Sequence, residues 1–289
     1  MDITQFQVPS DKKFSLESID PSKTIGFRSK LSAENKLKSD IEELSSMQAK
    51  LFAQGNRGVL VIFQAMDTAG KDSAIKHVLT GVNPQGVDVR NFRVPSEEEL
   101  SHDFLWRTMK ELPTRGKIMI FNRSYYEEVL VTRVHPELLG KESLPKSTLT
   151  KDIWKDRYED INAVERYLIR NGIDIVKIHL RISKEEQRKR LLARIDEPDK
   201  NYKIGTADVY ERTFWNDYMK AYEEMLQHTS TEIAPWYVIP SDHKWYTRIA
   251  VANILVQRLK SLEPSFPAIT KEKEKEIARA KRLLLKEGG

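Results

Sequence analysis

The 289-residue sequence contains no cysteine, which excludes disulfide bonds, thiolate metal sites and cysteine nucleophiles. No apolar stretch approaches the length that crosses a bilayer, and the opening residues MDITQ lack the basic start and apolar core of a signal peptide. The charge excess is also small, since 48 Lys and Arg against 43 Asp and Glu give a net charge of +5. We therefore expect a cytoplasmic protein whose basic residues matter by their placement.

Apolar runs and helical patterns alternate along the chain. Five short apolar runs begin near residues 59, 87, 117, 173 and 236, and each is followed by a helical pattern. This order predicts an α/β fold with a doubly wound, parallel, five-stranded sheet. We expect an extended arm over residues 1–30, the main domain over 31–267 and a charged helix over 268–289.

Residues 59–79 form the most informative stretch. The segment VLVIF at 59–63 predicts a strand buried on both faces, and apolar residues from Ala74 onward recur at helical spacing. Between them lies a small-residue loop that ends in Gly70 and Lys71. This is the setting of a phosphate-binding loop, in which backbone N–H groups and a helix amino terminus face the anion and a lysine reaches toward it.

The loop departs from the usual G-x-x-x-x-G-K-[S/T] pattern. Ala65 replaces the first glycine and Asp72 replaces the hydroxyl residue, with Ser73 one place later. Asp67 also puts a carboxylate inside the loop, which suits a metal ion or a proton better than a direct phosphate contact. The alternative is an ordinary turn in which Lys71 is solvated.

A polar cluster directly follows the third predicted strand. Ligands of open α/β sheets bind outside the carboxyl ends of the strands, where nucleotide enzymes usually carry a magnesium-binding aspartate. Here the position is Asn122, followed by Arg123, whose guanidinium suits a phosphoryl oxygen. The alternative is a turn with an incidental arginine. Further upstream, Ser96 and Glu99 are spaced as a capping box for a helix that carries His102 and Asp103, both interpreted as structural.

A second informative stretch covers about residues 184–218. Arg190 and Arg194 lie four residues apart, hence on one helix face, and a charged loop with Lys203 leads to a further helix from Thr206. Kinases of small phosphorylated substrates use such helix pairs as lids that bring cations onto the phosphoryl group. The alternative is a solvated, charged helical hairpin.

Several of these segments together resemble the family 2 polyphosphate kinases. The resemblance covers about residues 30–267 and rests on FQAMDTAGKD at 63–72, ELSHDFLWR at 99–107, FNRSYY at 121–126, VTRVHP at 131–136 and APWYVIP at 234–240. It implies a P-loop-kinase-like fold with a helical lid.

The resemblance also implies an activity. The family moves phosphoryl groups reversibly between inorganic polyphosphate and nucleotides with Mg²⁺, so Mg²⁺ (or Mn²⁺) is the expected cofactor. AMP, ADP and ATP, and guanine nucleotides as a further option, are the expected nucleotides. Asn122, with Ser124 and Glu127, resembles the branch that phosphorylates both nucleoside monophosphates and diphosphates. We expect a homo-oligomer, dimer or tetramer, with neither a nucleic-acid nor a membrane partner.

The resemblance implies a role for each of the candidate site residues. The predicted catalytic residues are Asp67, Lys71, Asn122, Arg123, Glu127 and Arg133. The predicted phosphate- and nucleotide-binding residues are Ala69, Gly70, Lys71, Asp72 and Ser73 in the loop and Arg190, Arg194, Lys203 and Arg212 in the lid. Asp67 is expected to bind the metal, directly or through water. The rival functions are an NTP-dependent nucleotide kinase of the same fold, distinguished by its donor, and an inactive polyanion- or nucleic-acid-binding module.

Overall fold

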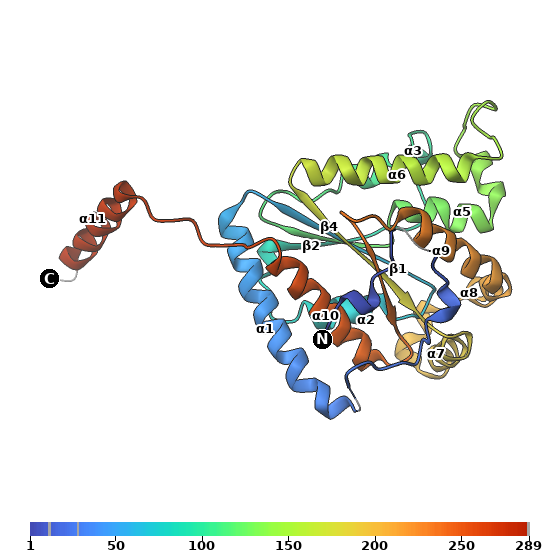
Figure 1. Cartoon of the computed structure of the whole chain (residues 1–289), viewed down its shortest axis with the longest axis horizontal. Coiled ribbons are helices and arrows are strands. Elements are labelled where there is room, and N and C mark those ends of the chain that lie inside the picture. The colour runs from blue at the N-terminus through green and yellow to red at the C-terminus, as the bar shows by residue number, and fades with distance from the viewer. Residues whose placement is uncertain (11–12, 28, 288–289) are drawn as a thin grey trace.

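A five-stranded sheet forms the centre of the computed structural model, which describes residues 1–10, 13–27 and 29–287 (Figure 1). The strands are all parallel and run in the order β2-β3-β1-β4-β5. Their bounds are β1 (Gly58–Ala65), β2 (Val87–Asn91), β3 (Ile118–Asn122), β4 (Ile173–Arg181) and β5 (Trp236–Pro240). β1 is central and buried along its whole length, because it pairs with β3 on one side and β4 on the other. The predicted parallel sheet is confirmed.

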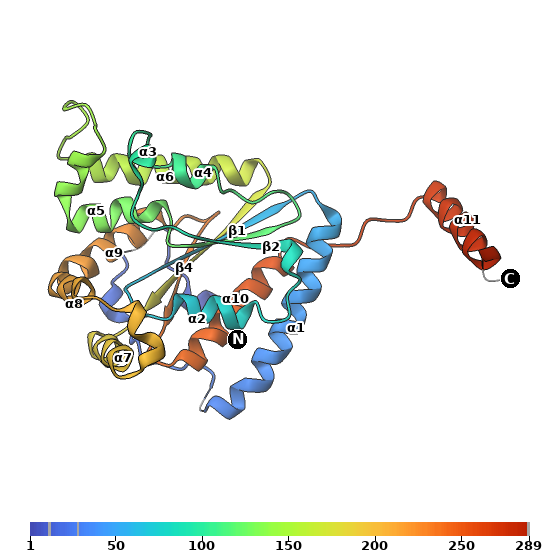
Figure 2. The same cartoon turned by 180° about the vertical axis from the view of Figure 1, so that it is seen from behind.

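Helices cover both faces of the sheet, as a doubly wound fold requires (Figures 1 and 2). One face carries α1 (Lys30–Gln54), α2 (Lys71–Val78) and α10 (Lys244–Lys260), with α10 packed between the other two. The opposite face carries α5 (Val131–Val134), α6 (Ile153–Arg170) and α9 (Trp215–Thr229). The phosphate-loop candidate therefore lies where β1 passes into α2, at the carboxyl edge of the sheet.

The lid helices and the last helix lie outside these two layers. The predicted lid region contains α7 (Lys184–Asp196), η6 (Pro198–Lys203), α8 (Thr206–Glu211) and η7 (Arg212–Phe214). The charged helix α11 (Lys271–Glu287) stands away from the body at the end of an extended segment (Figures 1 and 2). None of the helices within the described ranges is long and apolar enough to cross a membrane.

The amino-terminal arm lies on the body through β5. Gln7 forms an antiparallel bridge with Tyr237, and the Val8 N–H donates to the Trp236 carbonyl at 2.8 Å. The arm also contains two short 3₁₀ helices, η1 (Thr4–Phe6) and η2 (Leu16–Ser18). Residues 11, 12 and 28 of the predicted arm, and residues 288 and 289 of the predicted terminal helix, lie outside the described residues.

The single helix predicted from Ser96 is instead two short helices, α3 (Glu97–Leu100) and α4 (Trp106–Met109). The predicted capping box is present, since the Ser96 hydroxyl accepts from the Glu99 N–H and the Glu99 carboxylate accepts from the Ser96 N–H. The break comes from Asp103, whose carboxylate accepts the Leu105 N–H at 3.0 Å and so starts a new turn. Aspartate side chains compete for backbone N–H donors in this way. The helical periodicity of the sequence did not reveal the break.

A buried ion pair lies between β4 and α6. Lys177 is fully buried, and its ammonium donates to Glu165 at 2.6 Å, to the Thr229 carbonyl at 2.6 Å and to the Tyr126 hydroxyl at 3.2 Å. The second Glu165 oxygen accepts from the hydroxyls of Tyr125 and Tyr126. All three donors of the lysine are thus satisfied, which is the condition under which a buried charge is tolerated.

His179 makes the stability of the fold depend on pH. Burial, reinforced by the charge of Arg181, lowers the pKa of His179 to about 3. Below its ordinary pKa near 6.5 the unfolded chain binds a proton that the folded chain does not, so acid favours the unfolded state. We expect His179→Asn to flatten the fall in unfolding free energy between pH 6.5 and pH 3 by up to about 1.4 kcal/mol per pH unit.

Urea denaturation at several pH values measures this slope. His243→Asn, at an exposed histidine, is the matched control and should keep the wild-type slope. Equal slopes for His179→Asn and the wild-type protein would contradict a neutral, buried His179.

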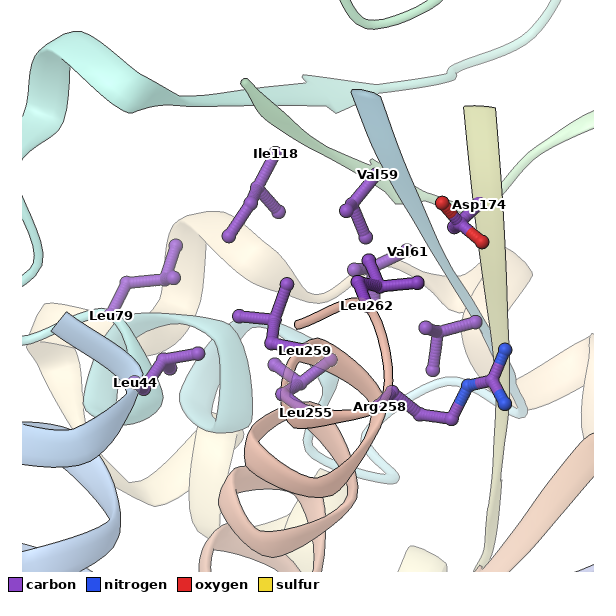
Figure 3. Close-up of a pocket in the computed structure, with 11 residues that line it drawn as sticks. Leu44, Val59, Val61, Leu79, Ile118, Asp174, Leu255, Arg258, Leu259 and Leu262 are labelled. Atoms are coloured by element: carbon purple, nitrogen blue, oxygen red, sulfur yellow. The ribbon is translucent and has the colours of Figure 1, made fainter. Parts of the chain in front are cut away.

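A small cavity lies at the opposite end of the sheet from the β1–α2 loop (Figure 3). Its lining is mostly apolar and comes from the first residues of the central strands, such as Val59 and Ile118, and from the last turns of α10. Its volume of about 10 Å³ is at the lower limit for one water molecule. This cavity is a packing gap in the core and no part of the candidate site.

Candidate active site

The loop between β1 and α2 is a tight turn with two residues in the left-handed region. Thr68 has a φ of 64° and Gly70 a φ of 111°. Glycine adopts such angles freely, whereas a β-branched threonine is strained there. The Ala69 N–H donates to the Met66 carbonyl at 3.2 Å and closes the turn. Strain that the surroundings hold in place is typical of ligand-binding loops.

Lys71, the first residue of α2, folds back over this loop. Its ammonium donates to the Ala65 carbonyl at 2.8 Å, and the side chain is buried. The other two N–H groups of the ammonium donate to no residue that the structure describes. Burial lowers the pKa of Lys71 and Arg123 adds to this, while the neighbouring carboxylates of Asp67, Glu127 and Asp72 oppose it. An anion bound here would raise the pKa of the lysine again and so favour its charged form.

Arg123, directly after β3, joins two of the predicted carboxylates. Its guanidinium lies 2.8 Å from Asp67 and 3.4 Å from Glu127. Gln64, near the end of β1, donates to the second Glu127 oxygen at 3.1 Å. Arg123 itself has a φ of 67°, so its backbone is also strained. The structure therefore brings together Asp67, Arg123 and Glu127, which the sequence had placed in one site.

Charges in this cluster hold each other ionised. Burial alone would raise the pKa of Asp67, but Lys71, Arg123 and Arg194 together hold that pKa below its usual value. Glu127 raises the pKa of Arg123 above its ordinary value, although burial acts in the opposite direction. Asp67 thus carries a full negative charge, and its side chain is still 38% exposed. A half-exposed, ionised carboxylate beside three cations is suited to bind a metal ion that accompanies an anion.

Asn122 is hydrogen-bonded to Asp72 and to Asn91 of β2. The Asn122 amide donates to Asp72 at 2.8 Å and to Asn91 at 2.6 Å. The Asn122 carbonyl oxygen is buried and has no partner among the described residues. Asp72 therefore fixes the asparagine at the edge of the site, and the free oxygen is left for a ligand or a water molecule.

The Ser73 hydroxyl is bound by Arg248, a residue that the sequence did not place in the site. Arg248 of α10 donates to the Ser73 hydroxyl at 3.0 Å. Gln64 and Gln187 were missed as well: Gln64 holds Glu127, and Gln187 donates to the Asp67 carbonyl at 3.1 Å. Gln64 directly follows the apolar run at 59–63 and stands in the motif FQAMDTAGKD, but no role of its own was predicted for it. Gln187 and Arg248 carried no sequence signal of a role in the site.

Three of the predicted lid cations, Arg194, Lys203 and Arg212, have their contacts within the lid itself. The Arg194 guanidinium donates to the Lys203 carbonyl at 3.3 Å, and its charge acts on Asp67. Arg212 donates to the carbonyl of Lys184 at 3.2 Å and to the side chain of Gln187. Lys203 is exposed, with its ammonium 5.4 Å from the Tyr202 ring. Of the three cations, the structure therefore brings Arg194 nearest to the loop in electrostatic terms.

Arg190 and Arg133 are placed differently from the expectation. Arg190 is only 7% exposed, and its guanidinium is engaged with backbone carbonyls instead of facing solvent. Arg133 forms an ion pair with Glu224 of α9 and donates to the Tyr158 hydroxyl of α6 at 3.4 Å. Its guanidinium is thus bound between two helices of the opposite layer, α9 and α6.

The donor set fits Mg²⁺. Magnesium usually takes one or two carboxylates and completes its shell with water and phosphate oxygens, and Asp67 and Glu127 supply such a pair. No cluster of three or more histidine or acidic side chains suited to a metal was found among residues 1–10, 13–27 and 29–287, so an all-protein cage is not offered there. The arrangement can therefore bind a phosphate chain together with its metal.

Comparison with known proteins identifies the family of this chain. The family model described as polyphosphate kinase 2 matches residues 28–267. The chain is 47% identical over 287 residues to an ADP-polyphosphate phosphotransferase of Rhodopseudomonas palustris, covering 98% of each chain. It is 42% identical over 264 residues to an AMP/ADP-polyphosphate phosphotransferase of Meiothermus ruber, covering 91% of this chain and 95% of the relative.

A solved structure agrees in fold. The crystal structure of polyphosphate kinase 2 from Arthrobacter aurescens superposes with a TM-score of 0.86 at 40% sequence identity, and the alignment covers 96% of this chain and 95% of that one. The sheet order, the β1–α2 loop and the matches along nearly the whole chain lead to one conclusion: this chain belongs to the polyphosphate kinase 2 family.

Proposed function

We propose that the protein transfers the terminal phosphoryl group of inorganic polyphosphate to a nucleotide, in the presence of Mg²⁺ and in a reversible reaction. The observation that carries the proposal is the cluster of Lys71, Asp67, Arg123 and Glu127 at the β1–α2 loop. The names of the relatives from R. palustris and M. ruber support polyphosphate as the donor. The proposal retains the homo-oligomer that the family resemblance implies and the cytoplasmic location expected from the composition of the sequence.

The proposed reaction is an in-line displacement. An oxygen of the terminal phosphate of the nucleotide attacks the terminal phosphorus of the polyphosphate. One P–O bond forms, the P–O bond to the next phosphate breaks, and the chain leaves one phosphate shorter with the bonding electrons. Such a reaction needs positioning and charge stabilisation more than covalent chemistry from the protein.

Each residue has a defined part in this proposal. Lys71 and the loop amides hold phosphates at the reacting centre, and Arg123 binds the transferred phosphoryl group. Asp67 holds the metal, directly or through water, with help from Glu127. When bound, Mg²⁺ neutralises charge on the phosphate oxygens. Arg194 approaches from the lid and shields the reaction from water.

A basic surface beside the loop supports polyphosphate as the ligand. Lys244 and Arg248 lie one turn apart on α10, and Arg248 contacts Ser73 of the loop. Burial lowers the pKa of Lys244, and the charges of Arg190, Lys200 and Arg248 add to this against a single Glu186. Cations that repel one another in this way are stabilised by a polyanion that runs past them.

We expect the double variant Lys244→Ala/Arg248→Ala to raise the KM for long-chain polyphosphate roughly tenfold, because charge-assisted hydrogen bonds to phosphate are lost. The KM for ADP should change by less than about twofold, since we assign this surface to the polyphosphate chain and not to the nucleotide. Steady-state kinetics with chains of several lengths measures both values. Lys151→Ala/Lys155→Ala, an exposed pair with the same spacing, is the control. An unchanged KM for polyphosphate would show that Lys244 and Arg248 do not bind the polyphosphate chain.

The acceptor is tested by offering AMP and ADP separately to the purified protein with Mg²⁺ and long-chain polyphosphate. We expect ATP from ADP and ADP from AMP, as the name of the M. ruber relative suggests for that protein. Product from ADP alone would restrict the acceptor to diphosphates, as in the name of the R. palustris relative. No product from either, with the protein folded, would favour the NTP-dependent kinase.

A further inference from the structure

The guanidinium of Arg190 uses all five of its N–H donors. Nε donates to Glu186 at 2.8 Å. One terminal nitrogen donates to the carbonyls of Thr68 at 3.0 Å and Ala69 at 2.9 Å. The other donates to the carbonyls of Ser241 at 2.7 Å and Asp242 at 2.9 Å. Five donors in a planar fork are the full capacity of an arginine, so no N–H remains for a phosphate in this arrangement.

These bonds fix how the peptide groups of the loop are turned. A trans peptide is planar, so its N–H points away from its carbonyl. Because Arg190 holds the carbonyls of Thr68 and Ala69, the N–H groups of Ala69 and Gly70 face the other side. The Ala69 N–H closes the turn on Met66, and the Gly70 N–H donates to no residue in the described part of the chain. The Gly70 amide is thereby presented to the side where an anion would bind.

The same helix face holds a third carbonyl. Gln187, three residues before Arg190 on α7, donates to the Asp67 carbonyl at 3.1 Å. Three consecutive loop carbonyls, from residues 67 to 69, are therefore bound by one face of α7. The loop contains two residues in the left-handed region, so it needs outside contacts to keep this shape.

We propose that Arg190 is a positioning residue that sets the peptide orientations of the phosphate loop, with Gln187 in support, and that it is not a ligand of the phosphoryl group. This inference rests on the proposed function of the loop. Its further consequence is that the first half of α7 stays joined to the body. Any closure of the lid then involves the segment after Arg190, where Arg194 lies.

The test compares Arg190→Lys with Arg190→Gln. A lysine keeps the positive charge but cannot donate to four carbonyls at once. If the planar guanidinium of Arg190 positions the loop, both variants should therefore lose about a hundredfold in kcat/KM. If Arg190 acts by its charge on phosphate, Arg190→Lys should retain most of the activity and only Arg190→Gln should lose it. For Arg194, which we expect to act by its charge, Arg194→Lys should keep a kcat/KM close to that of the wild-type protein and only Arg194→Gln should lose it. Near-wild-type turnover of Arg190→Lys would overturn the proposal.

Two further measurements separate positioning from a general loss of folding. Free guanidinium ion should restore part of the activity of Arg190→Ala, whereas methylammonium should not. Equal rescue by both would contradict the proposal that the planar guanidinium of Arg190 positions the loop. Binding of tripolyphosphate, measured by calorimetry without turnover, should weaken in Gln187→Ala by a few-fold and in Arg190→Lys by more. Unchanged binding in both would refute the positioning role. This readout is independent of the proposed transfer reaction, whose failure would appear as an inactive wild-type protein.

Discussion

Asp67→Asn is expected to lower kcat by about 10³-fold while the protein stays folded. Asparagine keeps the size of the side chain and its hydrogen bond to Arg123, but it removes the negative charge. That charge is present in the wild-type protein, because the surrounding cations hold the pKa of Asp67 below its usual value. On the proposed function, the metal would lose the carboxylate that holds it directly or through water, and the charge of Arg123 would no longer be balanced beside the phosphoryl group.

Steady-state kinetics with saturating polyphosphate, ADP and Mg²⁺ measures this effect. Asp88→Asn is the matched control, since Asp88 lies on the edge strand β2 in a partly exposed ion pair with Lys117. The control should keep wild-type kcat. Lys71→Ala should resemble Asp67→Asn, because it removes the ammonium that reaches over the loop. Turnover of a folded Asp67→Asn or Lys71→Ala within about threefold of wild type would show that the site has been assigned to the wrong residues.

Lys177→Met is expected to lower the free energy of unfolding by about 3–5 kcal/mol. The substitution leaves the Glu165 carboxylate buried without its cation, and burial without a partner is costly for a charge. For a domain of this size the melting temperature should fall by about 10 °C. Thermal and urea unfolding, followed by circular dichroism, measure both quantities.

A double-mutant cycle separates the ion pair from simple packing. Adding Glu165→Leu to Lys177→Met removes the unpaired charge, so the double variant should lose less stability than the sum of the two single variants. Recovery stays incomplete, because the hydroxyls of Tyr125 and Tyr126 then lack their acceptor. Lys155→Met, which breaks the exposed pair with Glu159, is the control and should change stability by less than about 0.5 kcal/mol. If the losses of unfolding free energy from Lys177→Met and Glu165→Leu were strictly additive in the double variant, the stabilising ion pair between these two residues would be contradicted.

The central part of the fold and of the site could be predicted because it depends on local patterns. A buried apolar strand before a small-residue loop defined β1 and the loop that contains Asp67 and Lys71. Parallel strands end at the same edge of a sheet, so Arg123 and Glu127 after β3 had to come close to that loop. The same reasoning could not give the direction of Arg133, which depends on its ion pair with Glu224.

Contacts between distant parts of the chain carried no local signal. Arg190 binds carbonyls more than fifty and more than one hundred residues away, and the periodicity of its helix shows only that it shares a face with Arg194. Lys177 was visible as a polar residue in an apolar strand, but its pairing with Glu165 depends on how α6 crosses β4. Arg248 lies on the last helix of the main domain, 175 residues from Ser73, and their contact depends on how α10 packs beside α2.

The most direct test of the central claim follows the transferred phosphate itself. Long-chain polyphosphate labelled with ³²P would be incubated with ADP, Mg²⁺ and the wild-type protein, with Lys71→Ala run in parallel. The account predicts label in the terminal phosphate of ATP with the wild-type protein and almost none with the variant. Absence of label in ATP, together with phosphorylation of AMP when GTP is the donor, would contradict transfer from polyphosphate and identify an NTP-dependent kinase.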